Sequence, residues 1–381
     1  MSDIRRMRLA LIIVAGAVVL AAVAWIATNR IHGQSEYPIS IGVVLPLTGD
    51  AAVYGQALKN GIELAASQDG ASKGPRITLT YQDDLGVPRE ALSAVRRLID
   101  IEHVPAIIGG AMSSTAEPII PVCDQAKVAL LSPTATKPSL TQMSSYFFRL
   151  WPSDNYDGKV MAEAAFKKLG ARRVAILYIN VAYGVGITQV FTHDFQALGG
   201  TIVASEGYRQ GETNFRTVLS KIAAQHPDAI YLPGYVAEIG NILRQARELN
   251  IRVRFIGVNS LYDPNLIKIA GDAAEGAVFT YPPFDVASAD PGVRNFIAAF
   301  RGRYGHDPDA FAAQGYDAYR VMRLALGRTT TFTGPAIRDA LHAIGRYSGP
   351  GGAFTFDAHG DVEKPLRLMT VKNGKFVEYP N

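Results

Sequence analysis

The sequence contains only one cysteine, Cys123. A single cysteine excludes an intramolecular disulfide, so the fold depends on packing and hydrogen bonds rather than on a covalent cross-link. Cys123 lies in an apolar stretch of helical character, which predicts a small buried thiol. No cysteine follows the apolar N-terminal run, and this excludes a lipid-modified N-terminus.

Charged residues are also scarce. They make up 19% of 381 residues, the net charge is +4, and the Lys and Arg residues are scattered. Without a basic cluster interleaved with aromatic residues, the sequence argues against nucleic-acid binding. The absence of low-complexity tracts and a hydrophobic content of 48% argue against disorder over most of the chain. This length is too great for one typical core and suits about two domains.

Motifs for catalysis, metal binding and nucleotide binding are missing. No G-x-S-x-G motif surrounds Ser113 and Ser114, and no complete G-x-G-x-x-G follows a predicted strand. None of the seven histidines pairs with a carboxylate at the spacing of metal ligands. We therefore expect no enzymatic activity, no cofactor and no metal.

The N-terminus combines three arginines with an apolar run. Arg5, Arg6 and Arg8 precede residues 9–27, which contain no charge. This pattern is typical of an export segment, and the positive-inside rule places the rest of the chain outside the cytoplasm. Ala22 and Ala24 offer a small-x-small cleavage site, but the run is also long enough to span a bilayer. A cleaved signal peptide and a retained membrane anchor both remain open.

Beyond residue 37, short apolar strands alternate with amphipathic helices. Residues 39–45 and 76–82 are predicted strands with a helix at 54–68 between them, and a second run of the same kind begins at 173–179. This alternation predicts an α/β fold with mostly parallel sheets and helices on both faces. The chain should therefore form two consecutive doubly wound units.

Stretches rich in turn residues mark where the chain passes between these units. They fall at 150–155, at 280–285 and, as a third crossing, at 345–352. Two units joined by several short connections form a hinge rather than a flexible tether.

Hydroxyl residues follow two consecutive buried strands. Ser113, Ser114 and Thr115 come after one strand, and Thr134 and Thr136 come after the next. Parallel α/β sheets bind ligands at the carboxyl ends of their strands, where the next helix offers free N–H groups. Serine and threonine are also ordinary helix caps, so either segment alone is compatible with simple capping. The pair together indicates a site for a small molecule that carries a carboxylate.

The order and spacing of several segments resemble those of a known family. They are "IGVVLPLTGDAAVYGQALKNGIELA", "IIGGAMSST", "SPTAT", "FRLWPSD", "YLPGYVAEIGNILRQAR", "FTFDAHGD" and "VKNGKF". Across nearly all of 38–380 the chain resembles the type I periplasmic binding proteins of branched-chain amino-acid (Leu/Ile/Val) uptake systems.

The resemblance implies two Rossmann-like lobes on a three-crossover hinge that close over one ligand. Residues 1–36 would be the signal peptide or anchor with its linker. The first lobe would comprise 37–152 and 282–346, and the second 153–281 and 347–381.

The family's polar contacts map onto four residues of this chain. By resemblance, the Ser113 hydroxyl and the backbone N–H of Ala135 would take the ligand carboxylate. A carbonyl and a side chain at Thr134 and Thr136 would hold its ammonium group.

Aromatic residues complete the implied site. Tyr54 matches a tyrosine that packs over the ligand, and Tyr183 and Tyr235 match tyrosines contributed by the second lobe. Trp151, in the first crossing, indicates either a flat or bulky ligand or simple packing within the hinge.

One position departs from the family. Its amino-acid binders place an acidic residue where this chain has Asn259, so a charge-assisted bond to the ammonium is lost. Asp154 or Asp285 would have to supply that charge.

The resemblance implies a monomeric, extracytoplasmic receptor that binds an amino acid or related carboxylate. Its partner would be the permease of an ABC importer, and only the N-terminal segment would contact the membrane. The alternative is a membrane-anchored ligand-sensing domain of the same fold.

Overall fold

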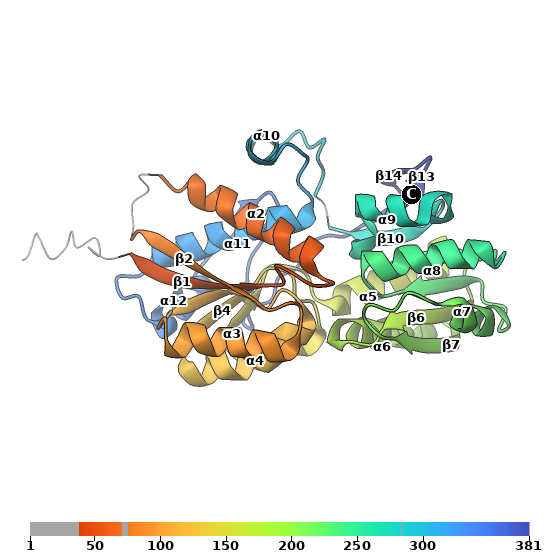
Figure 1. Ribbon diagram of the computed structural model, residues 1–381, viewed down its shortest axis with the longest axis horizontal. Coiled ribbons are helices and arrows are strands. Elements are labelled where there is room, and N and C mark those ends of the chain that lie inside the picture. The colour runs from red at the N-terminus through yellow and green to blue at the C-terminus, as the bar shows by residue number, and fades with distance from the viewer. Residues whose placement is uncertain (1–37, 71–74, 283, 381) are drawn as a thin grey trace, which may run out of the picture.

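The computed structural model describes residues 38–70, 75–282 and 284–380, which form two lobes lying side by side (Figure 1). The predicted export segment and linker, residues 1–36, lie outside these ranges. Within them, no helix has the length and apolar character needed to cross a membrane. The predicted α/β fold class, with mostly parallel sheets in two lobes, is confirmed.

The first lobe has a parallel sheet in the order β2-β1-β3-β4-β5. Its strands are β1 (Ile39–Leu45), β2 (Ile77–Asp83), β3 (Ala106–Gly109), β4 (Ala129–Ser132) and β5 (Phe147–Arg149). Its helices are α2 (Ala52–Ser67), α3 (Pro88–Asp100), α4 (Ser113–Ala126), α10 (Pro291–Tyr304), α11 (Ala310–Leu326) and α12 (Gly334–His342). Helices α2 and α11 lie on one side of this sheet, and α3 and α4 on the other (Figure 1). Covered on both faces, β3 and β4 are buried along their whole length.

Two glycines allow α11 to pack directly against α2. A Cβ at Gly61 would collide with the carbonyl of Ala312, and one at Gly315 would collide with the carbonyl of Leu58. Only glycine permits this approach of two backbones. The contact fixes the first turn of α11, which carries Phe311 to the cleft between the lobes.

The second lobe has a sheet in the order β14-β13-β10-β9-β8-β6-β7. Its strands are β6 (Arg173–Ile179), β7 (Thr201–Tyr208), β8 (Ala229–Leu232), β9 (Arg254–Gly257), β10 (Val278–Tyr281), β13 (Arg367–Lys372) and β14 (Lys375–Glu378). Its helices are α5 (Asp154–Glu163), α6 (Ala182–Ala197), α7 (Arg216–Ala223), α8 (Val236–Glu248) and α9 (Pro264–Ala270). In this sheet β13 runs antiparallel to both of its neighbours, β10 and β14, and it joins β14 at Asn373 and Gly374, which both have positive φ.

The chain passes from the first lobe to the second after β5 and returns to the first after β10. The third expected crossing does not lie at 345–352. The short strands β11 (Tyr347–Gly349) and β12 (Gly352–Phe354) stay on the first lobe, because the Tyr347 hydroxyl and the Gly351 N–H donate to Asp317 on α11.

The chain then remains on the first lobe for several more residues. Phe356 and Val362 belong to the core of that lobe, and Asp361 pairs with Arg149 at the end of β5. The third crossing therefore lies between Val362 and the start of β13, and the expected second-lobe segment 347–381 begins too early.

Contacts across the cleft hold the lobes together in a closed arrangement. The backbone N–H of Val236, at the start of α8, donates to the Tyr54 hydroxyl at 3.0 Å. Near the hinge, the Thr136 hydroxyl of the first lobe donates to Asp154 on α5 at 2.9 Å.

Candidate functional site

A cavity lies in the cleft, at the carboxyl ends of strands from both sheets. Its lining residues are Tyr54, Ala111, Met112, Ser113, Thr134, Thr136, Trp151, Tyr183, Tyr235, Asn259, Ser260 and Phe311. Eight of the ten residues singled out from the sequence are among them. The closed cleft therefore brings together in one place side chains from distant parts of the chain.

Two predicted residues do not face the cavity. Ser114 is half-buried in the first turn of α4 and does not line the site. Ala135 is buried, and its N–H donates to the Ser132 hydroxyl at 3.1 Å rather than pointing to a ligand. The Ala135 N–H is therefore already hydrogen-bonded to a neighbouring side chain and is not free for the ligand carboxylate that the resemblance assigned to it.

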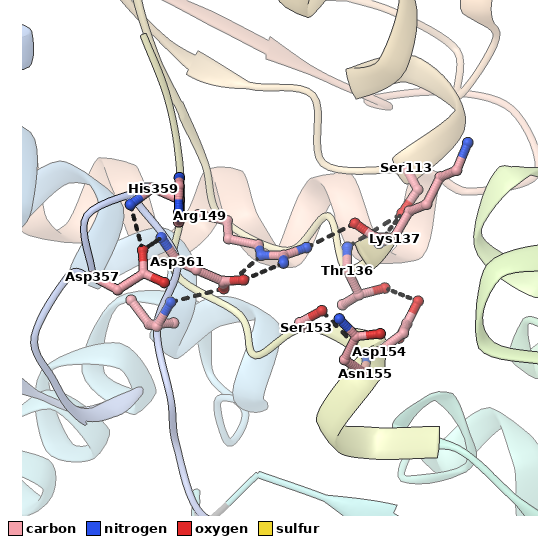
Figure 2. Close-up of polar contacts among 11 residues, drawn as sticks. Ser113, Thr136, Lys137, Arg149, Ser153, Asp154, Asn155, Asp357, His359 and Asp361 are labelled. Carbon is pink, nitrogen blue, oxygen red and sulfur yellow. Dashed lines mark hydrogen bonds and ion pairs between the residues drawn. The ribbon is translucent and has the colours of Figure 1, made fainter. Parts of the chain in front are cut away.

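Ser113 is the first residue of α4, in the connection that follows β3. Its Oγ accepts hydrogen bonds from the backbone N–H groups of Thr136, at 3.2 Å, and Lys137, at 3.1 Å (Figure 2). Because both lone pairs of this oxygen are used, the hydroxyl proton is left to donate elsewhere. The helix N-terminus adds free N–H groups and the positive end of its dipole. This end of the cavity therefore offers donors to a group such as a carboxylate.

Thr134 and Thr136, which follow β4, differ from Ser113 because their hydroxyl protons are already used in hydrogen bonds within the protein. The Thr134 hydroxyl donates to the carbonyl of Ala111 at 2.8 Å, and the Thr136 hydroxyl donates to Asp154 at 2.9 Å. A hydroxyl has one proton, so both oxygens keep only lone pairs for the cavity. This end offers acceptors to a donating group.

Asn259 adds a third acceptor from the second lobe. It begins a short 3₁₀ turn (Asn259–Leu261) after β9 and lines the cavity. Its side chain lies close enough to Asp157 to lower the pKa of that carboxyl. An ionised carboxyl favours the amide nitrogen as the group that faces it, which leaves the amide oxygen for the cavity.

Aromatic rings form a continuous wall across both lobes. The rings of Trp151 and Phe311 stack with centroids 5.2 Å apart, and Tyr54 lies 4.8 Å from Phe311. Tyr235 follows at 5.6 Å from Tyr54 and stacks on Tyr183 at 6.1 Å. Burial raises the pKa values of the Tyr54 and Tyr183 hydroxyls, so this wall is uncharged.

Asp83 supports the loop that leads to Tyr54. Its carboxylate accepts hydrogen bonds from the backbone of Leu47, at 2.8 Å, and from the Thr48 hydroxyl, at 2.6 Å. These bonds lower the pKa of Asp83 and hold the turn between β1 and α2. Asp83 thus acts on the site from outside the cavity.

Four lining residues were not predicted from the sequence: Ala111, Met112, Ser260 and Phe311. Met112 and Ser260 are direct neighbours of predicted residues, and Ala111 lies two positions before Ser113. Phe311 lies in the first turn of α11, which Asp309 caps by accepting the Ala312 N–H at 2.7 Å. That cap was a usable signal for the start of the helix, but not for its position beside the cleft.

Comparison with known proteins gives consistent results. Leu/Ile/Val-binding protein homolog 3 of Brucella melitensis is 28% identical over 364 residues, which cover 94% of this chain and 98% of that protein. The crystal structure of the leucine-binding protein LivK from Thermotoga maritima matches with a TM-score of 0.85 and 33% identity, covering 90% of this chain and 98% of that one.

A second solved structure is similar to the same extent. LivJ, a branched-chain amino acid transporter substrate-binding protein from Streptococcus pneumoniae in complex with isoleucine, matches with a TM-score of 0.82 and 29% identity. It covers 89% of this chain, and 98% of that chain is matched. The sequence pattern of a family described as periplasmic binding protein matches residues 38–375. This chain belongs to that periplasmic binding protein family, whose members work outside the cytoplasm.

Proposed function

We propose that the protein is the receptor of an ABC importer and that its ligand is a small amino acid with an apolar or aromatic side chain. The observation that carries this proposal is the separation of hydrogen-bonding character within one cavity. Ser113 offers a donor at one end, and Thr136 and Asn259 offer acceptor oxygens at the other. An amino acid has a carboxylate that accepts and an ammonium that donates, on adjacent carbons.

The aromatic wall accommodates the side chain of such a ligand. Trp151, Phe311 and Tyr54 line the cavity with apolar surface, and ligand sites of this kind are mostly apolar with a few placed polar groups. Relatives of this chain are named for binding leucine, isoleucine and valine. Both features favour an apolar or aromatic side chain over a charged one.

Closure couples binding to transport in this proposal. The ligand contacts both lobes only in the closed form, so binding shifts the population from open to closed. The closed receptor then delivers its ligand to the permease as a monomer and without turnover. Residues 9–27 would export the chain, either as a cleaved signal peptide or as a retained anchor, and a mass measurement on the mature protein distinguishes the two.

Calorimetry with matched pairs of compounds tests the proposal. Leucine and phenylalanine are compared with isocaproate and hydrocinnamate, their deaminated analogues, which keep the carboxylate and side chain but lack the ammonium. We expect tighter binding of the amino acids. Preference for the deaminated analogues, or binding of none of the four compounds, contradicts the proposal.

A further inference from the structure

Two buried carboxyl groups lie immediately behind the acceptor end of the cavity. Asp154 and Asp157 occupy the first turn of α5, three residues apart and therefore on the same face of the helix. Their exposed fractions are 0% and 3%. They lie beside the position where an amino-acid binder of this family would carry an acid and this chain has Asn259.

Asp154 faces the cavity residue Thr136. One oxygen of its carboxyl, Oδ2, accepts the Thr136 hydroxyl proton, as Figure 2 shows. The other, Oδ1, is buried and has no hydrogen-bond partner. The hydroxyl of Tyr183, a cavity residue that interacts electrostatically with Asp154, is also buried without a partner. An unpaired buried carboxylate oxygen is costly unless a donor reaches it.

Asp157 faces the cavity residue Asn259. Its Oδ1 accepts a hydrogen bond from the Thr280 hydroxyl at 2.5 Å, and the nearby side chain of Asn259 lowers its pKa. An ionised Asp157 favours the Asn259 amide nitrogen as the group that faces it, which leaves the amide oxygen for a donor from the ligand. Asp154 thus accepts a hydrogen bond from Thr136, and Asp157 acts electrostatically on Asn259.

The two aspartates have no cation of their own. Neither takes part in an ion pair among the described residues. The positive group that acts on Asp154 is Arg149, whose guanidinium is held by Asp361 and by the carbonyl of Lys137 (Figure 2). A negative charge on either buried carboxyl therefore lacks a partner unless the ligand brings one.

We propose that Asp154 and Asp157 together supply the counter-charge for the ligand ammonium that an acid at position 259 would otherwise supply. This inference rests on the proposed function, because it requires a ligand with an ammonium group. The two residues are positioning residues. They act through Thr136 and Asn259, whose acceptor oxygens they orient, and their charge makes the acceptor end selective for a cationic donor over a neutral one.

Calorimetry on four variants of the full chain tests this role with leucine and isocaproate as probes. Asp154→Asn and Asp157→Asn each neutralise one carboxyl at nearly constant shape. A third variant exchanges the pair, Asp157→Asn with Asn259→Asp, and so returns an acid to position 259. Asp84→Asn is the control, because Asp84 is an equally buried carboxyl that accepts the Gly86 N–H and does not line the cavity.

We expect Asp154→Asn and Asp157→Asn each to weaken leucine binding by about tenfold or more, while isocaproate binds as well as before or better. The control should keep the wild-type ratio of the two affinities. The exchanged variant should return leucine binding to within about threefold of wild type. Isocaproate binding also reports folding, so a variant that has merely unfolded loses both probes.

Three results overturn the inference. One is a ratio of leucine affinity to isocaproate affinity that stays at the wild-type value in both single variants. Another is an equal loss of both probes in folded protein, which indicates a structural role. The third is an exchanged variant as weak as Asp157→Asn. If the wild type itself prefers isocaproate, the proposed function fails. If the wild type and both single variants prefer leucine to the same degree, only the role of the aspartates is removed.

Discussion

The two ends of the cavity are built in different ways. The donor end, around Ser113, is made by one lobe, where the N–H groups of Thr136 and Lys137, after the next strand, hold the Ser113 hydroxyl in place. The acceptor end is shared, because Thr136 comes from the first lobe and Asp154 and Asn259 come from the second. One end is therefore preformed within a single lobe, whereas the other is completed only when the lobes close.

The difference suggests how the receptor distinguishes its ligands. A ligand that has a carboxylate but no amine binds the donor end in the open form. It makes few of the contacts that stabilise the closed form. An amine reaches acceptor oxygens that come together only when the lobes meet. Since a ligand shifts an equilibrium only by its differential affinity for the two states, the acceptor end should decide which ligands close the cleft.

The largest expected effect comes from breaking the donor end. Ser113→Ala removes the hydroxyl that donates to the carboxylate, at a cost of about 1.5–3 kcal/mol, which is about 10- to 150-fold in Kd. Leucine and isocaproate should weaken alike because both carry a carboxylate. Calorimetry measures the effect, and Ser114→Ala, at the neighbouring residue outside the cavity, should bind as the wild type does. Unchanged leucine affinity in Ser113→Ala contradicts the assignment of this end.

The acceptor end should respond to pH. Burial raises the pKa of the Asp157 carboxyl to about 6, although its interactions with Thr280 and Asn259 act in the opposite direction. Asp154 lies beside it on the same helix, and burial raises its pKa as well. The hydroxyl of Tyr231, on β8, stays neutral because burial raises its pKa too.

A bound ammonium favours the ionised carboxylate, so the pKa of Asp157 is lower with ligand than without it. Between pH 7 and pH 5 the free protein takes up a proton that the complex does not hold, and leucine affinity should fall by about five- to tenfold. Isocaproate affinity should stay constant or rise, because protonation removes a like charge. The Kd of each compound across this range gives the result, and parallel pH profiles for the two compounds contradict the expected contrast.

The same contrast between the two ends explains what the sequence could predict. Ser113, Thr134 and Thr136 follow strands that are neighbours in a parallel sheet, so their meeting at one edge follows from the strand order. Asp157 was not predicted because its partners, Thr280 and Asn259, come from distant segments that only the folded second lobe brings together.

The misplaced third crossing has a similar cause. The glycines and the single proline of 345–352 are typical of a connection between lobes. The segment instead stays on the first lobe because Asp317 accepts hydrogen bonds from Tyr347 and Gly351, both distant from it in the sequence. Turn composition predicts where the chain bends, whereas the lobe to which a bend belongs depends on such long-range contacts.

A smaller effect is expected from the contact that joins the lobes. Tyr54→Phe keeps the ring but removes the oxygen that accepts the Val236 N–H across the cleft. The closed form should lose about 0.5–1.5 kcal/mol, so that leucine, which closes the cleft, binds about two- to twelvefold more weakly. Isocaproate, which binds the open form, should weaken less. Small-angle scattering should show that saturating leucine still reduces the radius of gyration, as in the wild type. An equal loss for both compounds, or an unchanged radius on leucine binding in the wild type, contradicts this account of closure.

The smallest effect should come from Asp285, the second carboxyl that the sequence offered as a substitute for the missing acid. Its Oδ1 accepts the Ala287 N–H at 2.7 Å within the connection from β10 to α10, and it does not line the cavity. Asp154, by contrast, is fully buried and bonded to the cavity residue Thr136. Asp285→Asn should therefore change leucine affinity by less than about twofold, since surface substitutions away from such contacts cost little. Calorimetry beside Asp154→Asn makes the comparison direct, and a loss at position 285 as large as that at 154 would mean that the ammonium receives its charge from the hinge loop rather than from α5.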